Sequence, residues 1–227
     1  MKASTDRASL LSALRFLRPA VPRKSPKAAL PCALLSVAEG AEGRALLSLR
    51  GTDLELEACA SVSAADVEPG SATVELSALL DTLRGSKAER VSLSVDVEAW
   101  RLSVSLSDGA CLSLSLGVDV EEYPCAQEQP SDGAAAVLDP LTLRDALSLS
   151  AFAAAREPGR YAMHGVRFKV EGDGLRCVAT DGRRLSVASA PTVEGRPADD
   201  FSSEGEPIAP HPWAKALLGT HALPKRR

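Results

Sequence analysis

The sequence predicts an α+β fold in which a helix followed by three strands is repeated along the chain. Three observations support this prediction. Amphipathic segments of helical period alternate with runs of strand period. Several segments return in the same order about 128 to 134 residues later. A repeat of that length is the size of a domain, longer than the repeats of solenoids or propellers.

The recurring segments also suggest where the domains lie. Residues 5–14 return at 138–147, Thr52-Asp53 returns as Thr180-Asp181, and residues 73–85 return at 207–219. Two helix-plus-three-strand repeats then make one domain. We expect one complete domain at residues 1–125, a linker at 126–133 and a partial second domain at 134–227 that lacks its last strands.

The first predicted helix begins after Asp6, a favourable N-cap residue, and ends at Pro19. Its apolar positions follow helical spacing at Leu10, Leu11, Leu14 and Leu17. At 100° per residue, Arg7, Arg15 and Arg18 fall in a sector of roughly 80° beside this apolar stripe. We expect these arginines to border the surface that the helix covers.

Two groups of three strands are predicted next. The first group comprises residues 33–37, 45–49 and 54–62, with a glycine-containing turn at 39–43 forming a hairpin. A short helix with Leu79, Leu80 and Leu83 precedes the second group, which comprises residues 91–95, 100–106 and 112–116. Serine alternates with apolar residues in the second group, which predicts a sheet with one buried face and one solvent-exposed face.

The pattern begins again after an acidic segment. Residues 117–133 contain Tyr123-Pro124 and Pro130, which is typical of a linker. A helix follows with Asp139 as its N-cap, Pro140 in its first turn, and Leu143, Leu147 and Phe152 as apolar positions. Strands are expected at residues 166–170, 175–179 and 185–189. A fourth repeat begins at Ile208, with a short helix through Trp213 and Leu217.

Composition narrows the class of protein. The chain is 45% hydrophobic and 25% charged, typical of a globular protein, and no apolar run is long enough to span a membrane. The N-terminus lacks a secretory signal, and the five cysteines lack the spacing of a metal site or a disulfide framework. We therefore expect a cytoplasmic protein whose cysteines are buried as small hydrophobic residues.

Charge is distributed unevenly. The net charge is −4, yet residues 1–27 carry seven basic residues and one acid, whereas acids gather at 119–132 and 194–206. This segregation would permit one face to bind a polyanion. Solvated surface charge without a ligand explains the same pattern equally well at this point.

Four segments resemble one known family. They are residues 23–27 (RKSPK), 52–57 (TDLELE), 160–166 (RYAMHGV) and 178–185 (VATDGRRL). In this combination the chain resembles the bacterial DNA polymerase III beta subunit, the replicative sliding clamp. The resemblance implies the DNA-clamp fold: three similar domains per chain, closed head-to-tail as a dimeric ring around duplex DNA, with helices lining the hole. The third domain would be absent here.

The resemblance also implies functional residues. The DNA-binding positions would be Arg23, Lys24 and Lys27, together with Arg84 and Tyr161. A cleft for short hydrophobic peptides of partner proteins would contain Met163, Thr180, Gly182, Arg183, Arg184 and Leu185. Pro210-His211-Pro212 replaces a basic start of the fourth helix, so a basic DNA-binding position would be absent there, and only half of the cleft lining would be present.

Simpler explanations exist for several of these residues. Thr180-Asp181-Gly182 could be a tight turn only, and Tyr161 could be a half-buried aromatic at a strand edge. His164 and His211 lack partners at metal-ligand spacing, so we expect no metal and no cofactor. Asp53 and Asp181 occupy equivalent positions of the repeat. This favours a hydrogen-bonded turn that occurs in each copy of the repeat over a catalytic pair of carboxylates.

The resemblance implies a processivity factor that tethers a replicative polymerase to duplex DNA and is not itself an enzyme. Its partners would be DNA of any sequence, and polymerase and clamp-loader subunits that bind through short hydrophobic peptides. The chain would also self-associate or associate with a full-length clamp. The alternative is a truncated clamp paralogue that acts as a protein-interaction module, or caps a clamp, without encircling DNA.

Overall fold

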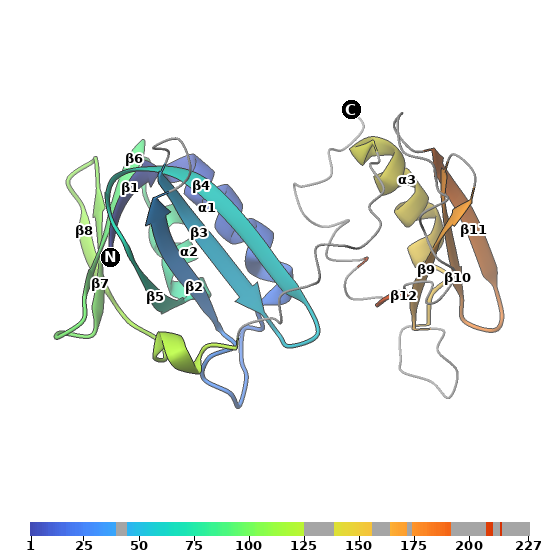
Figure 1. Cartoon of the computed structure of the whole chain (residues 1–227), viewed down its shortest axis with the longest axis horizontal. Helices are drawn as coiled ribbons and strands as arrows, with labels where there is room; N and C mark the ends of the chain where they lie inside the picture. Colours follow the sequence, from blue (N-terminus) through green and yellow to red (C-terminus); the bar gives the residue numbers. More distant parts are fainter. Residues whose placement is uncertain are drawn as a thin grey trace. The chain divides into compact units, whose positions relative to one another are not determined.

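A computed structural model describes residues 1–39, 45–124, 139–155, 164–171, 174–191, 208–210 and 214 of the chain. The chain divides into two compact units, Met1–Gln127 and Glu128–Arg227 (Figure 1). Each unit has its own cluster of buried hydrophobic residues. In the described part, no helix is long and apolar enough to cross a membrane.

The first unit contains two copies of a strand–helix–three-strand repeat. The first copy is β1 (Lys2–Asp6), α1 (Arg7–Leu17), β2 (Cys32–Glu39), β3 (Ala45–Thr52) and β4 (Glu57–Glu68). The second copy is β5 (Gly70–Glu75), α2 (Leu76–Arg84), β6 (Arg90–Asp96), β7 (Arg101–Leu106) and β8 (Cys111–Ser115). Figure 1 shows both helices lying against the curved sheet.

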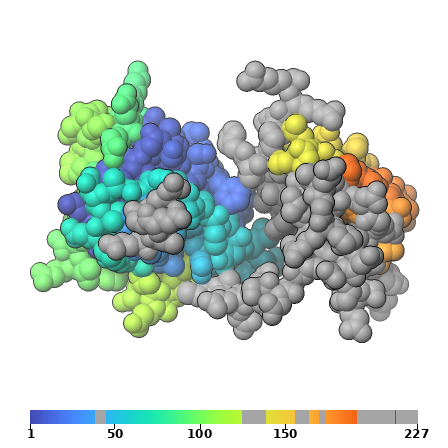
Figure 2. All heavy atoms as spheres, turned by 45° about the horizontal axis from the view of Figure 1, so that its top comes forward, coloured from blue at the N-terminus to red at the C-terminus, as the bar shows by residue number. Residues whose placement is uncertain are grey.

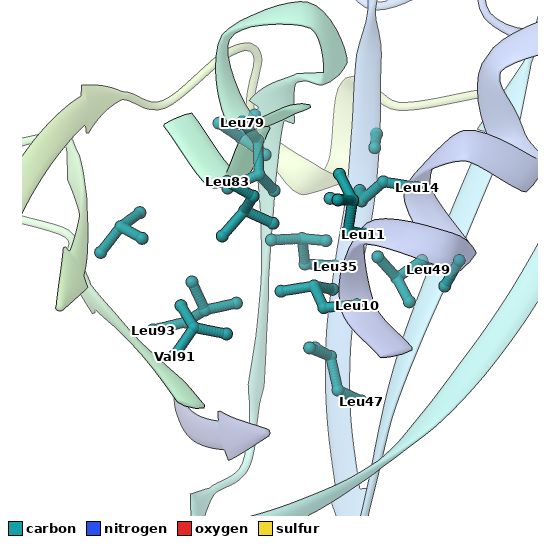
Figure 3. Packing of buried hydrophobic residues seen from close by; sticks show 14 of the residues in the cluster. Leu10, Leu11, Leu14, Leu35, Leu47, Leu49, Leu79, Leu83, Val91 and Leu93 are labelled. Atoms are coloured by element: carbon teal, nitrogen blue, oxygen red, sulfur yellow. The ribbon is translucent and has the colours of Figure 1, made fainter. Parts of the chain in front are cut away.

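All eight strands of the first unit belong to one antiparallel sheet in the order β5-β2-β3-β4-β1-β6-β7-β8. An isolated bridge between Val74 of β5 and Leu116, just after β8, links the two outermost strands. The sheet is therefore nearly closed around its core. Both helices contribute leucines to that core, including Leu10, Leu14, Leu79 and Leu83 (Figure 3).

The predicted first helix is confirmed. The Asp6 carboxylate accepts a hydrogen bond from the backbone N–H of Ser9 at 2.6 Å, as an N-cap residue does. Arg7 is half-exposed, and its side chain joins the start of α1 to the end of α2. Arg7 Nε donates to the Ala88 carbonyl at 2.6 Å, and Nη1 donates to the Leu83 carbonyl in the last turn of α2 at 3.0 Å.

Two strand predictions need correction. Strand β1 was not predicted, because residues 2–6 contain no large apolar side chain, yet β1 lies between β4 and β6 and its three central residues are buried. The third strand was predicted from residue 54 but begins at Glu57, because residues 53–56 form a tight turn. The alternation in β6 and β7 does separate buried apolar residues from the serine face.

The second unit repeats part of this architecture. It contains α3 (Pro140–Ala151), β9 (Gly165–Glu171), β10 (Gly174–Thr180), β11 (Leu185–Pro191) and β12 (Ile208–Pro210). The sheet order β12-β9-β10-β11 matches β5-β2-β3-β4 of the first unit. The strands also pair at the same ends, since Gly165 at the start of β9 lies opposite Pro210 at the end of β12, as Cys32 at the start of β2 lies opposite Glu75 at the end of β5. These matches confirm the domain-sized repeat.

Helix α3 begins as predicted and ends differently. Asp139 accepts hydrogen bonds from the backbone N–H and the hydroxyl of Thr142 at 2.8 and 2.7 Å. Leu147 is buried, but Phe152 follows the helix and is exposed, so its assignment to the apolar face was wrong. Of the helix expected through Trp213 and Leu217, only Ala214 belongs to the described residues.

Residues 117–124 are packed on the first unit rather than forming the start of a linker. The backbone N–H of Gly117 donates to the Thr73 carbonyl at 2.9 Å. The side chain of Tyr123 is only 2% exposed, and its hydroxyl lies 3.3 Å from the carbonyl oxygens of both Cys32 and Arg50. Burial raises the pKa of Tyr123 to about 12.

This burial makes the first unit sensitive to alkali. The folded protein binds the Tyr123 proton more tightly than the unfolded chain does. The stability that this proton contributes is therefore intact below pH ~10 and is lost between pH ~10 and ~12. The chain has two tyrosines, so Tyr161→Phe leaves Tyr123 as the only one. In that variant we expect tyrosinate absorbance to appear with a midpoint near pH 12. A midpoint near pH 10 would show that Tyr123 is not held in this way.

The cysteine prediction is correct for two residues and wrong for two. Cys32 and Cys177 are buried, whereas Cys59 and Cys111 are exposed on strands. Burial raises the pKa of the Cys177 thiol to about 11, so it remains protonated and unreactive near neutral pH. All four are free, and Cys125 lies outside the described residues.

Candidate functional site

Exposed basic side chains follow the end of α1, and another lies at the end of α2. A short 3-10 helix, Arg18–Ala20, follows α1 and leads into the loop that carries Arg23, Lys24 and Lys27. These three side chains are exposed, as is Arg84 in the last turn of α2. We call Arg18, Arg23, Lys24, Lys27 and Arg84 the basic surface. Figure 2 shows the segment near residue 20, drawn in blue, at the surface of the first unit.

Positive charge is concentrated on this surface. Partial burial lowers the pKa of Arg18, and the charges of Arg23 and Arg84 lower it further. Arg84 forms an exposed ion pair with Asp81 at 3.5 Å. Such a pair is screened by water and offsets little of the charge. The arrangement therefore suits a phosphate-bearing polyanion.

The second sequence motif forms a tightly bonded turn between β10 and β11. The Thr180 hydroxyl donates to the Arg184 carbonyl at 2.7 Å and accepts from the backbone N–H of Gly182 at 3.1 Å. Asp181 Oδ1 accepts from the backbone N–H groups of Arg183 and Arg184, each at 3.0 Å. Gly182 has φ +82°, a conformation that favours glycine.

The first unit contains the same turn between β3 and β4. The Thr52 hydroxyl donates to the Leu56 carbonyl at 2.7 Å and accepts from the backbone N–H of Leu54 at 2.9 Å. Asp53 Oδ1 accepts from the backbone N–H groups of Glu55 and Leu56 at 3.0 and 2.7 Å. Asp53 and Asp181 thus stabilise equivalent turns in the two units, as the repeat predicted.

Leu54 occupies the position of Gly182 with φ +81°, which is strained for a residue with a Cβ atom. Its side chain is 53% exposed, so little packing is removed with it. We expect Leu54→Gly to raise the free energy of unfolding of the first unit by about 0.5–1 kcal/mol, since relief of strain exceeds the added chain entropy. Leu54→Ala, which retains the strain, is the matched control. Equal stability of the two variants in urea unfolding would contradict this explanation.

Apolar and basic side chains lie together beside the turn of the second unit. Arg184 Nε donates to Asp181 Oδ2 at 2.9 Å, and its guanidinium lies over the Phe152 ring, 5.6 Å from the centroid. Leu185 is 66% exposed and Phe152 is 59% exposed. This arrangement offers an apolar contact and guanidinium donors to a bound segment. Phe152 was missed because its helical spacing indicated a core position.

The remaining sequence-predicted residues contribute less to these surfaces. Tyr161 and Met163 lie outside the described residues. His164 Nδ1 lies 2.9 Å from the Ala155 carbonyl oxygen, a local structural contact. Among the described residues, no group of three histidine, cysteine, aspartate or glutamate side chains could hold a metal ion.

The two units match two consecutive family models. The DNA polymerase III beta subunit, N-terminal domain, matches residues 1–127, and the central domain of the same subunit matches residues 137–201. The chain belongs to the DNA polymerase III beta subunit family. The resemblance found in the four sequence segments is therefore correct, and so is the DNA-clamp fold.

Curated relatives of this family are sliding clamps. The chain is 33% identical to the beta sliding clamp of Escherichia coli (strain K12) over 199 residues, which are 87% of this chain and 52% of the relative. It is 32% identical to the beta sliding clamp of Pseudomonas aeruginosa over 190 residues, 83% of this chain and 49% of the relative. The chain thus spans about half the length of the curated relatives it matches.

Solved structures of the family have a similar fold. A DnaN sliding clamp from Pseudomonas aeruginosa bound to griselimycin has a TM-score of 0.81 and 29% identity, covering 96% of this chain and 56% of that one. The pol III beta of Caulobacter crescentus has a TM-score of 0.80 and 28% identity, covering 96% and 57%. The clamp fold of the described units is therefore shared with these proteins.

Proposed function

We propose that the chain is a sliding clamp-like processivity factor that tethers a DNA polymerase and its partners to duplex DNA. The observation that carries this proposal is the basic surface on the N-terminal clamp unit. Its side chains come from the end of α1, the following loop and the end of α2. The role requires no catalytic residue.

The chemistry of the basic surface suits binding without sequence recognition. Lysine and arginine contacts to phosphates release counterions and carry no information about the bases. Arg23, Lys24 and Lys27 lie within a five-residue stretch of one exposed loop, where they can follow a phosphate backbone. We place Arg84 in the same interface. Tyr161, which lies outside the described residues, is a further DNA-binding position proposed from the sequence alone.

Lys24→Glu tests this role. The variant should bind duplex DNA more weakly, and the slope of log K against log salt should become shallower, by about 0.9 for each phosphate that the protein no longer neutralises. Arg101→Glu is the matched control, because it makes the same charge change on an exposed residue of β7. If the two variants reduce the affinity for duplex DNA equally, as measured by fluorescence anisotropy, Lys24 is not part of the interface.

A second candidate is an interaction module that binds clamp partners without encircling DNA. It is favoured by the exposed side chains of Arg183, Arg184 and Leu185 at the β10–β11 turn. The sequence also assigns Thr180, Gly182 and Met163 to the peptide cleft, and Met163 lies outside the described residues. These residues would hold short hydrophobic peptides of polymerase and clamp-loader subunits.

Topological retention on DNA separates the two candidates. A ring would stay on a nicked circular plasmid and dissociate after linearisation. Light scattering would show whether the ring is closed by self-association or by association with a full-length clamp. An interaction module would bind peptides and show equal retention on circular and linear DNA.

A further inference from the structure

The two helices of the first unit pack against each other, and the start of α1 meets the end of α2. Arg7 Nη1 donates to the carbonyl of Leu83, in the last turn of α2, at 3.0 Å. The backbone N–H of Arg7 also donates to the carbonyl of Glu89, five residues after α2 ends, at 2.9 Å. These bonds fix one end of the helix pair.

The sheet places the end of α1 and the start of α2 at the other end of the pair. Gly51, near the end of β3, lies against Leu17, the last residue of α1. Strand β2 begins beside this part of β3, and its first residue, Cys32, pairs with Glu75, the residue that precedes α2. The two helices are therefore antiparallel.

Each helix has one exposed arginine in its last turn, Arg15 on α1 and Arg84 on α2. Because the helices are antiparallel, the backbones of these two arginines lie at opposite ends of the pair. At 1.5 Å per residue, the distance along α1 from its start to Arg15 is about 12 Å. The exposed α1 residues between the two ends, Ala8, Ser9 and Ser12, have small side chains, so a bound strand can approach closely.

We propose that Arg15 contacts the phosphate backbone of duplex DNA, and that Arg15 and Arg84 bind two different phosphates at the two ends of the helix pair. This inference rests on the proposed function and adds a residue to it. Arg15 belongs neither to the basic surface nor to the four segments that resemble the clamp family. Only the arrangement of the helices identifies it.

The chemistry and the spacing both suit this role. A planar guanidinium presents paired N–H donors that match a phosphate, and bonds between ionised groups are stronger than neutral ones. Within the described part of the chain, no carboxylate lies at ion-pair distance from Arg15. The separation of about 12 Å is close to the width of the major groove of B-DNA, so the two arginines can contact phosphates on either side of one groove.

The test is the salt dependence of duplex DNA binding by the full chain, measured by fluorescence anisotropy. Arg15→Gln and Arg84→Gln should each make the slope of log K against log salt shallower by about 0.9, and the double variant by about 1.8. Arg15→Lys should keep the slope of the unmodified chain, because it keeps the charge. Arg101→Gln, on an exposed residue of β7, is the control and should leave the slope unchanged.

Each other outcome overturns a defined part of the account. If Lys24→Gln makes the slope shallower and Arg15→Gln does not, Arg15 is not a contact while the DNA-binding role stands. If the double variant loses no more than either single variant, the arrangement with two phosphates is wrong. If Arg15→Lys is as deficient as Arg15→Gln, the charge of Arg15 does not bind a phosphate. If the unmodified chain shows no salt-dependent binding, the proposed function itself fails.

Discussion

Replacing Leu14 with alanine is expected to lower the free energy of unfolding of the first unit by about 2–5 kcal/mol. Leu14 is fully buried on α1 and points into the core that both helices share with the sheet (Figure 3). Removing its branched end takes away apolar contacts and leaves a cavity, which close-packed neighbours fill only in part. Urea unfolding followed by circular dichroism measures the change.

Leu112→Ala provides the matched control for this prediction. Leu112 lies on β8, is exposed, and makes the same chemical change without opening a cavity in the core. We expect it to alter the free energy of unfolding by about 0.5 kcal/mol or less. Similar losses of stability for the two variants would contradict the packing of α1 described above. The comparison also matters for function, because α1 leads through the 3-10 helix Arg18–Ala20 into the loop that carries Arg23, Lys24 and Lys27.

The double variant Arg183→Ala/Arg184→Ala is expected to reduce affinity for a short partner peptide by about tenfold or more. Hydrogen bonds from charged groups contribute about 1.5–3 kcal/mol, and one such bond accounts for that factor. Removing the Arg184 guanidinium also removes the group that lies over the Phe152 ring. Anisotropy of a labelled peptide with two apolar residues and a carboxylate measures the effect.

The control for the double variant is Arg176→Ala. Arg176 is exposed on β10 of the same unit and is not part of the β10–β11 turn. We expect it to leave peptide affinity within about twofold of the unmodified chain, as is usual for a surface substitution away from the binding site. Unchanged affinity of the double variant, or an equal reduction with Arg176→Ala, would show that the peptide binds elsewhere.

The sequence was most informative where local chemistry decides the structure. Asp6 and Asp139 both cap helices through their own carboxylates, so a short motif predicts each helix start. Alternation of serine with apolar residues predicts β6 and β7 because one sheet face is buried and the other is not. Thr52-Asp53 and Thr180-Asp181 form the same turn because its hydrogen bonds are made within five residues.

The sequence was least informative where distant parts of the chain decide the outcome. The buried centre of β1 is Ala-Ser-Thr, which resembles a loop until its place between β4 and β6 is known. Arg7 has the helical position of a surface arginine, but its partners are carbonyls at residues 83 and 88. Phe152 has the spacing of a core residue, yet α3 ends one residue before it.

Salt dependence of binding to two duplexes of unrelated sequence tests the central claim most directly. The basic surface contains five cationic side chains, and we expect at least three of them to contact phosphates. The account predicts equal affinity for both duplexes and a slope of log K against log salt of about −3 or steeper. No measurable binding at low salt, a slope near zero, or a strong preference for one sequence would contradict it.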